Sequence, residues 1–295
     1  MKILHSSVRR GAEFLSARCV LKNSSGYTLL EMAIVLIIIA LLTGGIVVGR
    51  NLVEQSIKRA VLAEMDKYIK AVRLFSDRYN QLPGDINRAE ALWGSDTVNG
   101  CPGVFSAGTV PQTPTCNGDG NGTIGSFDGT NFTHTTEWYR AWQHMANAGV
   151  IDGQYSGVGG NATSDLLLGK SVPKSAYAGG GYMLLFRYYN GTPASAEDFL
   201  FTGQHVLEFG AVDSGCAGGA DTTSCITHGA LLTPSDALEI DDKIDDGVPG
   251  TGVVMGRPST STLNPGCTTT ANATTSQYNV SNTVAACGLI VGTGF

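Results

Sequence analysis

The feature that most constrains this chain is an apolar run near its start. Tyr27 to Val48 comprises 22 residues, and Glu31 is the only charged one among them. A helix rises about 1.5 Å per residue, so the run is about 33 Å long and can cross the hydrocarbon core of a bilayer. A carboxylate in hydrocarbon costs several kcal/mol unless it is paired, neutralised or functional. The run therefore predicts a membrane-spanning helix in which Glu31 has a specific role.

The charge of the chain is distributed unevenly around this run. Residues 1–26 carry a net charge of +4, whereas the whole chain has a formal charge of −6, so the remainder carries −10. Basic flanking residues stay on the cytoplasmic side of a membrane, which places the acidic body outside. An acidic body argues against nucleic acid as its partner and suits cations. A secretory signal peptide is a poorer interpretation of these residues, because the apolar run is too long and has no A-x-A cleavage signal.

The sequence after the apolar run is amphipathic. Apolar residues recur at steps of three and four, which is typical of one buried helix face, until Pro83-Gly84 ends the pattern. The positions are Val53, Ile57, Val61, Met65, Tyr68, Val72, Phe75 and Tyr79. We therefore expect one helix over residues 27–79, with Gly44-Gly45 as either a hinge or a site of close helix packing.

Six of the seven cysteines lie beyond the apolar run, in loop-like sequence. An even number of cysteines in such sequence indicates three disulfides and an oxidising compartment. Fifteen pairings are open, and we expect neighbours to pair because each bond would then close one local loop; free thiols are the alternative. The expected pairs are Cys101–Cys116, Cys216–Cys225 and Cys267–Cys287.

The rest of the chain predicts a mixture of helices and a few strands. Helices are expected over residues 86–93, over 135–148 as an amphipathic helix followed by Gly149, and from Thr233 to about Asp245, with Thr233 as N-cap. Residues 181–189 and 198–209 are rich in aromatic and aliphatic residues, which is typical of strands. The tail, 256–295, is expected to form a disulfide-closed loop or hairpin.

The stretch Lys22…Gly26-Tyr27-Thr28-Leu29-Leu30-Glu31-Met32 resembles the cleavage site of type IV prepilins and type II secretion pseudopilins. The resemblance includes the basic leader, the glycine at the cut, the apolar helix with one Glu and the amphipathic continuation. It implies that a prepilin peptidase cuts after Gly26 and N-methylates Tyr27, a position that is more often Phe in the family.

The resemblance also implies a role for Glu31. In assembled pilins the corresponding carboxylate meets the N-terminal ammonium of a neighbouring subunit, and opposite charges attract strongly in a low dielectric. The alternative is an incidental polar residue that snorkels to the interface.

The fold that the resemblance implies is α+β. It consists of a removed leader (1–26), a helix with a transmembrane and assembly part (27–48) and an amphipathic part (49–79), and a disulfide-containing extracytoplasmic globular domain (85–295) with a small antiparallel sheet.

Two acidic segments are candidate calcium sites. The first resembles an EF-hand loop in the spacing of its oxygen side chains, with Gly122 at the sixth position; a Gly/Asn turn is the alternative. Its candidate ligands are Asn117, Asp119, Asn121, Thr123 and Asp128. The second places like charges at the end of a helix, where a cation, Lys243, Arg257 or a neighbouring subunit's arginine would compensate them; a solvated helix end is the alternative. Its residues are Asp241, Asp242, Asp245 and Asp246.

The sequence contains no GxSxG, HExxH or phosphate-binding loop motif, so we expect a structural protein and not an enzyme. The resemblance implies a pilin or minor pilin that is inserted in the inner membrane and then assembled into a periplasmic or cell-surface filament. The implied partners are prepilin peptidase, an assembly ATPase with its platform protein, and other pilins. The alternatives are a type II secretion pseudopilin and a single-span anchor for a calcium-dependent binding or adhesion domain.

Overall fold

The fold is described from a computed structural model. It covers residues 26–98, 100–101, 111–127, 132–133, 136–159, 166–187, 199, 203–212, 227–261 and 264–295. The chain divides into two compact units, residues 1–52 and residues 53–295. Apart from Gly26, the expected leader lies outside the described residues.

The first unit contains the start of the long helix α1, Leu29–Tyr79, as the sequence predicts. Its large apolar side chains are exposed; Leu36 and Leu41, for example, are 63% and 72% exposed. By length and composition α1 can cross a membrane, and none of the apolar window that meets this criterion is buried. An exposed apolar surface of this extent needs lipid or other protein to cover it.

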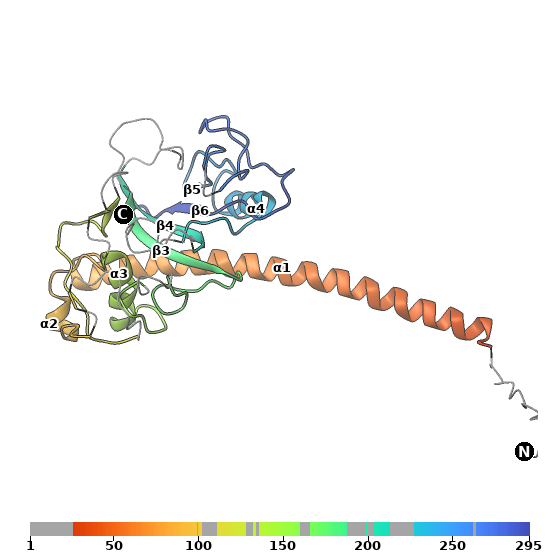
Figure 1. The fold of residues 1–295 in the computed structure, drawn as a ribbon, viewed down its shortest axis with the longest axis horizontal. Coiled ribbons are helices and arrows are strands. Elements are labelled where there is room, and N and C mark those ends of the chain that lie inside the picture. The colour runs from red at the N-terminus through yellow and green to blue at the C-terminus, as the bar shows by residue number, and fades with distance from the viewer. Residues whose placement is uncertain are drawn as a thin grey trace, which may run out of the picture. The chain divides into compact units, whose positions relative to one another are not determined.

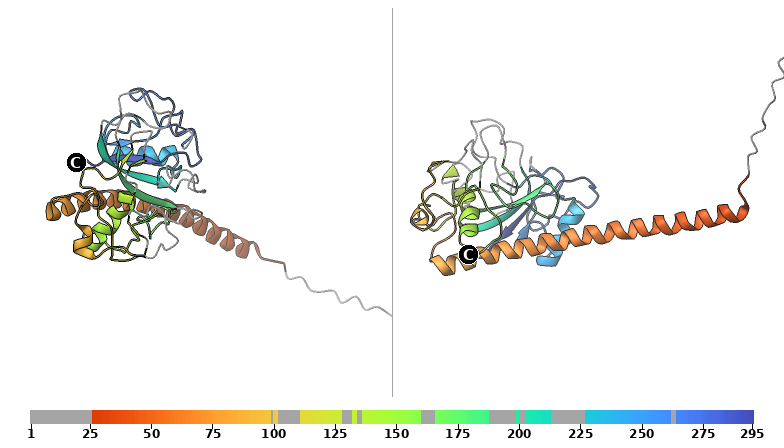
Figure 2. Two further views of the ribbon diagram at one scale, coloured as in Figure 1. Left: turned by 60° about the vertical axis from the view of Figure 1, so that its left-hand side comes forward. Right: turned by 90° about the horizontal axis from the view of Figure 1, so that it is seen from below.

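In the second unit, the remainder of α1 supplies one wall of the hydrophobic core (Figures 1 and 2). Its predicted apolar face is buried from Val61 to Phe75, and Tyr68 packs edge-on against Trp142 of helix α3, Thr136–Asn147, with ring centroids 5.1 Å apart. The prediction is wrong for Val53, which is 59% exposed. The buried stripe begins where other elements of this unit cover the helix.

Polar side chains of α1 also bind the rest of the second unit. Glu64 accepts hydrogen bonds from the hydroxyls of Ser175 and Tyr182, and Arg73 donates to the backbone carbonyl of Thr293 at 2.8 Å. Lys58 forms ion pairs with Asp236 and Glu239. These contacts set the rotation of α1 about its axis as well as its position.

The described strands form a six-stranded sheet in the order β2-β1-β3-β4-β6-β5. The four neighbouring strands β3-β4-β6-β5 are antiparallel, as expected, whereas β1 pairs in parallel with β3. Residues 188–190, 198 and 200–202 of the expected strands lie outside the described residues, and β4 begins at Gln204 and continues to Ala211, two residues beyond the prediction. The strands are β1 Ser126–Phe127, β2 Phe132–Thr133, β3 Gly180–Arg187, β4 Gln204–Ala211, β5 Val254–Met255 and β6 Leu289–Gly292.

Helix α3 differs from its prediction, because its middle is buried on every side. The expected apolar face, Trp138, Trp142 and Met145, is in the core, but the polar side chains of Arg140 and His144 are also at most 1% exposed. Arg140 forms an ion pair with Asp96 at 2.9 Å. A helix that is buried on all sides carries polar residues only where each one has a hydrogen-bond or ion-pair partner. The sequence of α3 is therefore amphipathic although no face of its middle is exposed to solvent.

The two remaining helices are short. Helix α4, Pro234–Ile244, begins as predicted: Thr233 accepts the backbone N–H of Asp236 at 3.2 Å and Pro234 occupies the first turn. Helix α2, Ala89–Trp93, is shorter than the expected 86–93. Residues before it form a turn, in which the backbone N–H of Ile86 bonds the carbonyl of Leu82.

Two disulfides join neighbouring cysteines, Cys101–Cys116 and Cys267–Cys287. Both are among the three pairs expected from the sequence. Cys216 and Cys225 lie outside the described residues.

Candidate functional site

The segment before α1 is an exposed, non-helical peptide. Residues 26–28 precede the first helical turn, Tyr27 is 82% exposed, and no described atom beyond the glycine and its chain neighbours lies within 4 Å of where a Cβ on Gly26 would be. A peptidase must reach the backbone on both sides of the bond that it cuts. The predicted bond between Gly26 and Tyr27 meets this requirement in the described part of the chain.

Thr28 and Glu31 form a capping box at the start of α1. The Glu31 carboxylate accepts hydrogen bonds from the backbone N–H and the hydroxyl of Thr28, at 2.8 and 2.9 Å, and the Thr28 hydroxyl accepts the backbone N–H of Glu31 at 3.2 Å. The first N–H groups of a helix have no partner within the helix, and this motif satisfies two of them reciprocally. Glu31 therefore has a local partner before any other chain is present.

Both of these bonds to Glu31 end on one oxygen, Oε2. A carboxylate can accept about four hydrogen bonds. No described residue donates to Oε1, so this oxygen can accept a further donor. The carboxylate lies four residues beyond Tyr27, the residue expected to become the new N-terminus. The helix start thus leaves one oxygen of the Glu31 carboxylate open to a donor from another chain.

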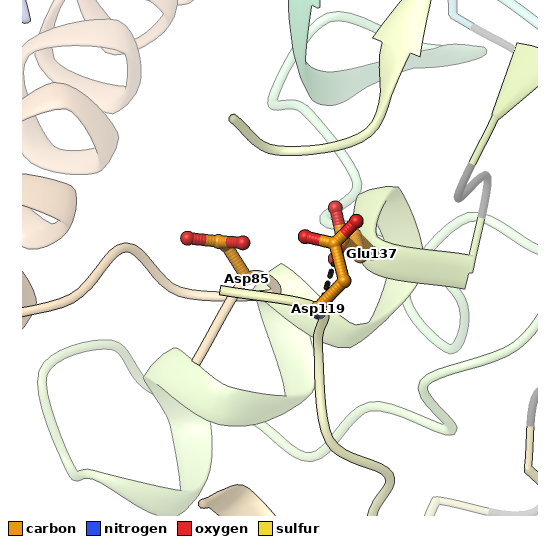
Figure 3. A group of neighbouring side chains, drawn as sticks. All are labelled: Asp85, Asp119 and Glu137. Carbon is orange, nitrogen blue, oxygen red and sulfur yellow. Dashed lines mark hydrogen bonds between the residues drawn. The ribbon is translucent and has the colours of Figure 1, made fainter. Parts of the chain in front are cut away.

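A group of three acidic side chains lies in the second unit. Asp85 comes from the turn after α1, Asp119 from the loop before β1, and Glu137 from the first turn of α3. One carboxylate oxygen of each lies within 4.8 Å of the others, and Figure 3 shows the side chains next to one another. Asp85 and Glu137 are 2% exposed, whereas Asp119 is exposed. We call these residues the acidic triad.

Backbone N–H groups hold the acidic triad in place. Glu137 accepts from Asp119 at 3.0 Å, the dashed line in Figure 3, and from Gly125 at 2.7 Å. Asp85 accepts from Gly122 at 3.0 Å through Oδ2. Burial raises the pKa of Glu137 to about 7, and the nearby charges of Asp119 and Asp85 add to the effect. Burial likewise raises the pKa of Asp85.

Two glycines allow the three segments to meet. Gly84 has a φ of +86°, and a Cβ there would lie 2.4 Å from the backbone oxygen of Glu137. A Cβ on Gly118 would lie 2.2 Å from the backbone oxygen of Gly84. Real Cβ atoms do not approach so closely, so both positions require glycine.

The predicted EF-hand ligands do not converge on one point. The side chain of Asn117 accepts the backbone N–H of Glu90 at 2.9 Å, at the start of α2. Asn121 bonds Asp119 and Thr123 along the loop. Of the five predicted residues only Asp119 belongs to the acidic triad, and Asp128 lies outside the described residues.

The second predicted cluster is partly assembled. Asp241, Asp245 and Asp246 offer oxygens within 4.8 Å of one another, and Asp242 is exposed outside this group. Each of the three holds loop groups in place: Asp241 accepts from the Tyr278 hydroxyl, Asp245 from the Val253 backbone, and Asp246 from the Thr251 hydroxyl. Burial raises the pKa of Asp241 to about 6. The cluster therefore anchors the loop after α4.

The two basic residues expected to compensate this second cluster pair with other acids. Lys243 forms an ion pair with Glu239, and Arg257 lies 3.6 Å from the buried Glu208. The carboxylate of Glu208 also pairs with Arg187, and these charges hold its pKa well below the usual range despite burial. This group is a buried ion-pair network of the sheet.

Sequence reasoning missed Asp85 and Glu137. Asp85 follows Leu82-Pro83-Gly84, which predicts a turn but not a ligand. Glu137 directly precedes the aromatic residues of α3, a position that likewise does not indicate a ligand. The close approach that joins them depends on Gly84 and Gly118. A glycine next to an acidic residue in each of two loops was the only available signal.

Comparison with known protein families yields a match near the start of the chain. Residues 21–47 match the model of the prokaryotic N-terminal methylation motif. No curated protein and no solved structure matches the chain. The matched residues contain Gly26, Tyr27, Thr28 and Glu31 together with most of the apolar run. Residues 21–47 of this chain are thus a type IV pilin/pseudopilin-like prepilin segment.

Proposed function

We propose that this chain is a structural subunit of a type IV pilus-like filament. Prepilin peptidase cuts it after Gly26, and the N-terminal helix then leaves the membrane and polymerises with those of other subunits. The observation that carries the proposal is the open Oε1 of Glu31, held at the helix start by Thr28 and followed by an apolar helix surface that no described residue covers.

The physical reason is charge neutralisation between neighbouring subunits. Cutting after Gly26 creates an ammonium at Tyr27, and an ammonium and a carboxylate in a low dielectric attract strongly, while either alone is disfavoured. Thr28 occupies Oε2, which leaves Oε1 for the amine of the next subunit. The exposed apolar side chains of residues 29–52 then pack against equivalent helices instead of lipid.

The test compares Glu31→Ala with a matched variant on the same helix, Glu54→Ala, whose side chain is exposed and lies beyond the matched segment. Both are expressed as full chains in cells with the assembly machinery. N-terminal sequencing of sheared filaments and of the membrane fraction reports the cut, and mass spectrometry reports N-methylation at Tyr27. The amount of the chain in sheared filaments reports assembly.

We expect Glu31→Ala to be cut after Gly26 and to accumulate in the membrane, while Glu54→Ala assembles as wild type does. Equal incorporation of Glu31→Ala and wild type into filaments would contradict the pairing. A wild-type chain that keeps residues 1–26 and stays in the membrane would instead indicate an anchored binding domain.

A further inference from the structure

The acidic triad contains a buried oxygen that the fold leaves without a partner. Oδ1 of Asp85 is inaccessible to solvent and has no hydrogen-bond partner within the described residues, although Oδ2 accepts the Gly122 N–H. The residue is 2% exposed. An unpaired buried oxygen on a carboxylate is costly, so a native structure that retains one calls for an additional partner at that position.

The surroundings of Asp85 supply negative charge. One carboxylate oxygen of each of the three residues lies within 4.8 Å of the others, and Glu137 accepts hydrogen bonds from the backbone N–H groups of Asp119 and Gly125. Three carboxylates at such distances repel one another unless protons or a cation neutralise them. The donors to Asp85 Oδ2 and to Glu137 are uncharged backbone groups, which fix these side chains in place without adding positive charge.

We propose that Asp85, Asp119 and Glu137 bind a calcium ion that joins the turn after α1, the loop before β1 and helix α3. The site differs from the EF-hand-like spacing in the sequence, since only Asp119 is common to both. It does not depend on whether the chain forms a filament.

The donor set identifies the class of ion. All three ligands are carboxylate oxygens, which suit hard cations such as calcium and magnesium rather than zinc or copper. Magnesium is usually held by one or two carboxylates and keeps several waters, whereas calcium takes more protein oxygens in a flexible geometry. Three carboxylates that each offer one oxygen therefore favour calcium.

The site is also accessible from solvent. A cavity of about 730 Å³ is lined by Asp85, Gly120 and Gly122 together with the end of α1, including Asp77. Asp119 is exposed, so one side of the ion can keep water ligands. Calcium takes six to eight oxygens, so waters complete the coordination that three carboxylates begin.

The experiment uses the full chain purified in detergent, stripped of metal with chelator, at pH 7.5. Thermal unfolding is followed by tryptophan fluorescence with calcium, with magnesium or with chelator. Terbium is a second probe, because Trp138 adjoins Glu137 and can sensitise its luminescence. The test variants are Asp85→Asn and Asp119→Asn. The matched control is Asp77→Asn, which removes the same charge from the same cavity outside the acidic triad.

We expect calcium at about 100 times its dissociation constant to raise the wild-type midpoint by about 5–10 °C. Magnesium should raise it less, and Asp77→Asn should behave as wild type does. Asp85→Asn and Asp119→Asn should lose most of the calcium shift and the terbium signal. Because Asp119 is exposed, Asp119→Asn is expected to fold, and it tests the site even if Asp85→Asn does not fold.

A wild-type midpoint unmoved by calcium, with no sensitised terbium emission, would overturn the proposal. Calcium shifts of equal size in wild type and Asp119→Asn would place the ion elsewhere in the chain. An equal response to magnesium would overturn the assignment to calcium.

Discussion

Gly84 donates its backbone N–H to Nδ1 of His144 at 3.0 Å, deep in the second unit. Because Nδ1 accepts, the ring proton of neutral His144 is on Nε2, which lies 2.9 Å from the Thr115 hydroxyl and 3.2 Å from the Cys116 carbonyl. One neutral imidazole thus joins α3 to the turn after α1 and to the loop that the first disulfide closes.

This arrangement makes stability sensitive to acid. Burial lowers the pKa of His144 to about 3, and the nearby charge of Arg140 adds to the effect. In the unfolded chain His144 titrates near pH 6.5. Below that pH the unfolded chain binds a proton at His144 whereas the folded chain does not, so the free energy of unfolding decreases as the pH falls toward 3. At pH 5 the loss is about 2 kcal/mol relative to pH 7.5.

The measurement is urea unfolding of wild type and His144→Asn between pH 7.5 and 4.5. Asn keeps an acceptor near the position of Nδ1 and does not titrate. We expect the stability advantage of wild type over His144→Asn to shrink as the pH falls. An advantage that is constant over this range would contradict the account.

Thr28→Ala removes the side-chain half of the capping box and leaves Glu31 in place. Loss of an N-cap hydroxyl costs about 1 kcal/mol of local helix stability, so the first amides of α1 should exchange about fivefold faster. Hydrogen exchange of the full chain in detergent, read by mass spectrometry of N-terminal peptides, measures this. Thr28→Ser, which keeps the hydroxyl, should exchange at the wild-type rate; equally fast exchange in both variants would argue against the cap.

The bond between Cys267 and Cys287 encloses a sequence separation of 20 residues. Opening it in the Cys267→Ala, Cys287→Ala double variant should lower the free energy of unfolding by about 3 kcal/mol, through the added freedom of the unfolded chain. Both sulfurs are buried, so alanine leaves no charged group in the core. Chemical denaturation of both chains under oxidising conditions gives the difference, because the double variant keeps the Cys101–Cys116 bond. Equal free energies of unfolding would contradict this contribution.

Gly118→Ala should destabilise the second unit by about 3 kcal/mol, because the added Cβ would meet the backbone of residues 84–85. Gly49→Ala is the control, since no described atom beyond the adjacent backbone of its own helix lies within 4 Å of its Cβ position. Thermal unfolding of both variants tests this. If Gly118→Ala retains the wild-type midpoint, the close approach of the two loops is not required.

The elements that sequence reasoning found are those set by local physics. The period of α1, the cap at Thr233 and the pairing of neighbouring cysteines each depend on residues close in the sequence. Asp85 and Glu137 escaped prediction because their meeting depends on long-range packing across Gly84 and Gly118. The burial of α3 on all sides was not predicted for a related reason. A polar residue such as Arg140 is expected at the surface unless its buried partner is known.

The order of the sheet has a consequence for the time course of folding. Strand β6, Leu289–Gly292, lies between β4 and β5 although it follows both in the sequence. While the chain is synthesised from its N-terminus, β4 keeps an open edge and β5 has no neighbouring strand until residues 289–292 emerge. An open edge is a template for pairing with another chain. Nascent chains at high local concentration would therefore risk pairing their strands with one another, and a chaperone that covers the open edge of β4 would prevent it.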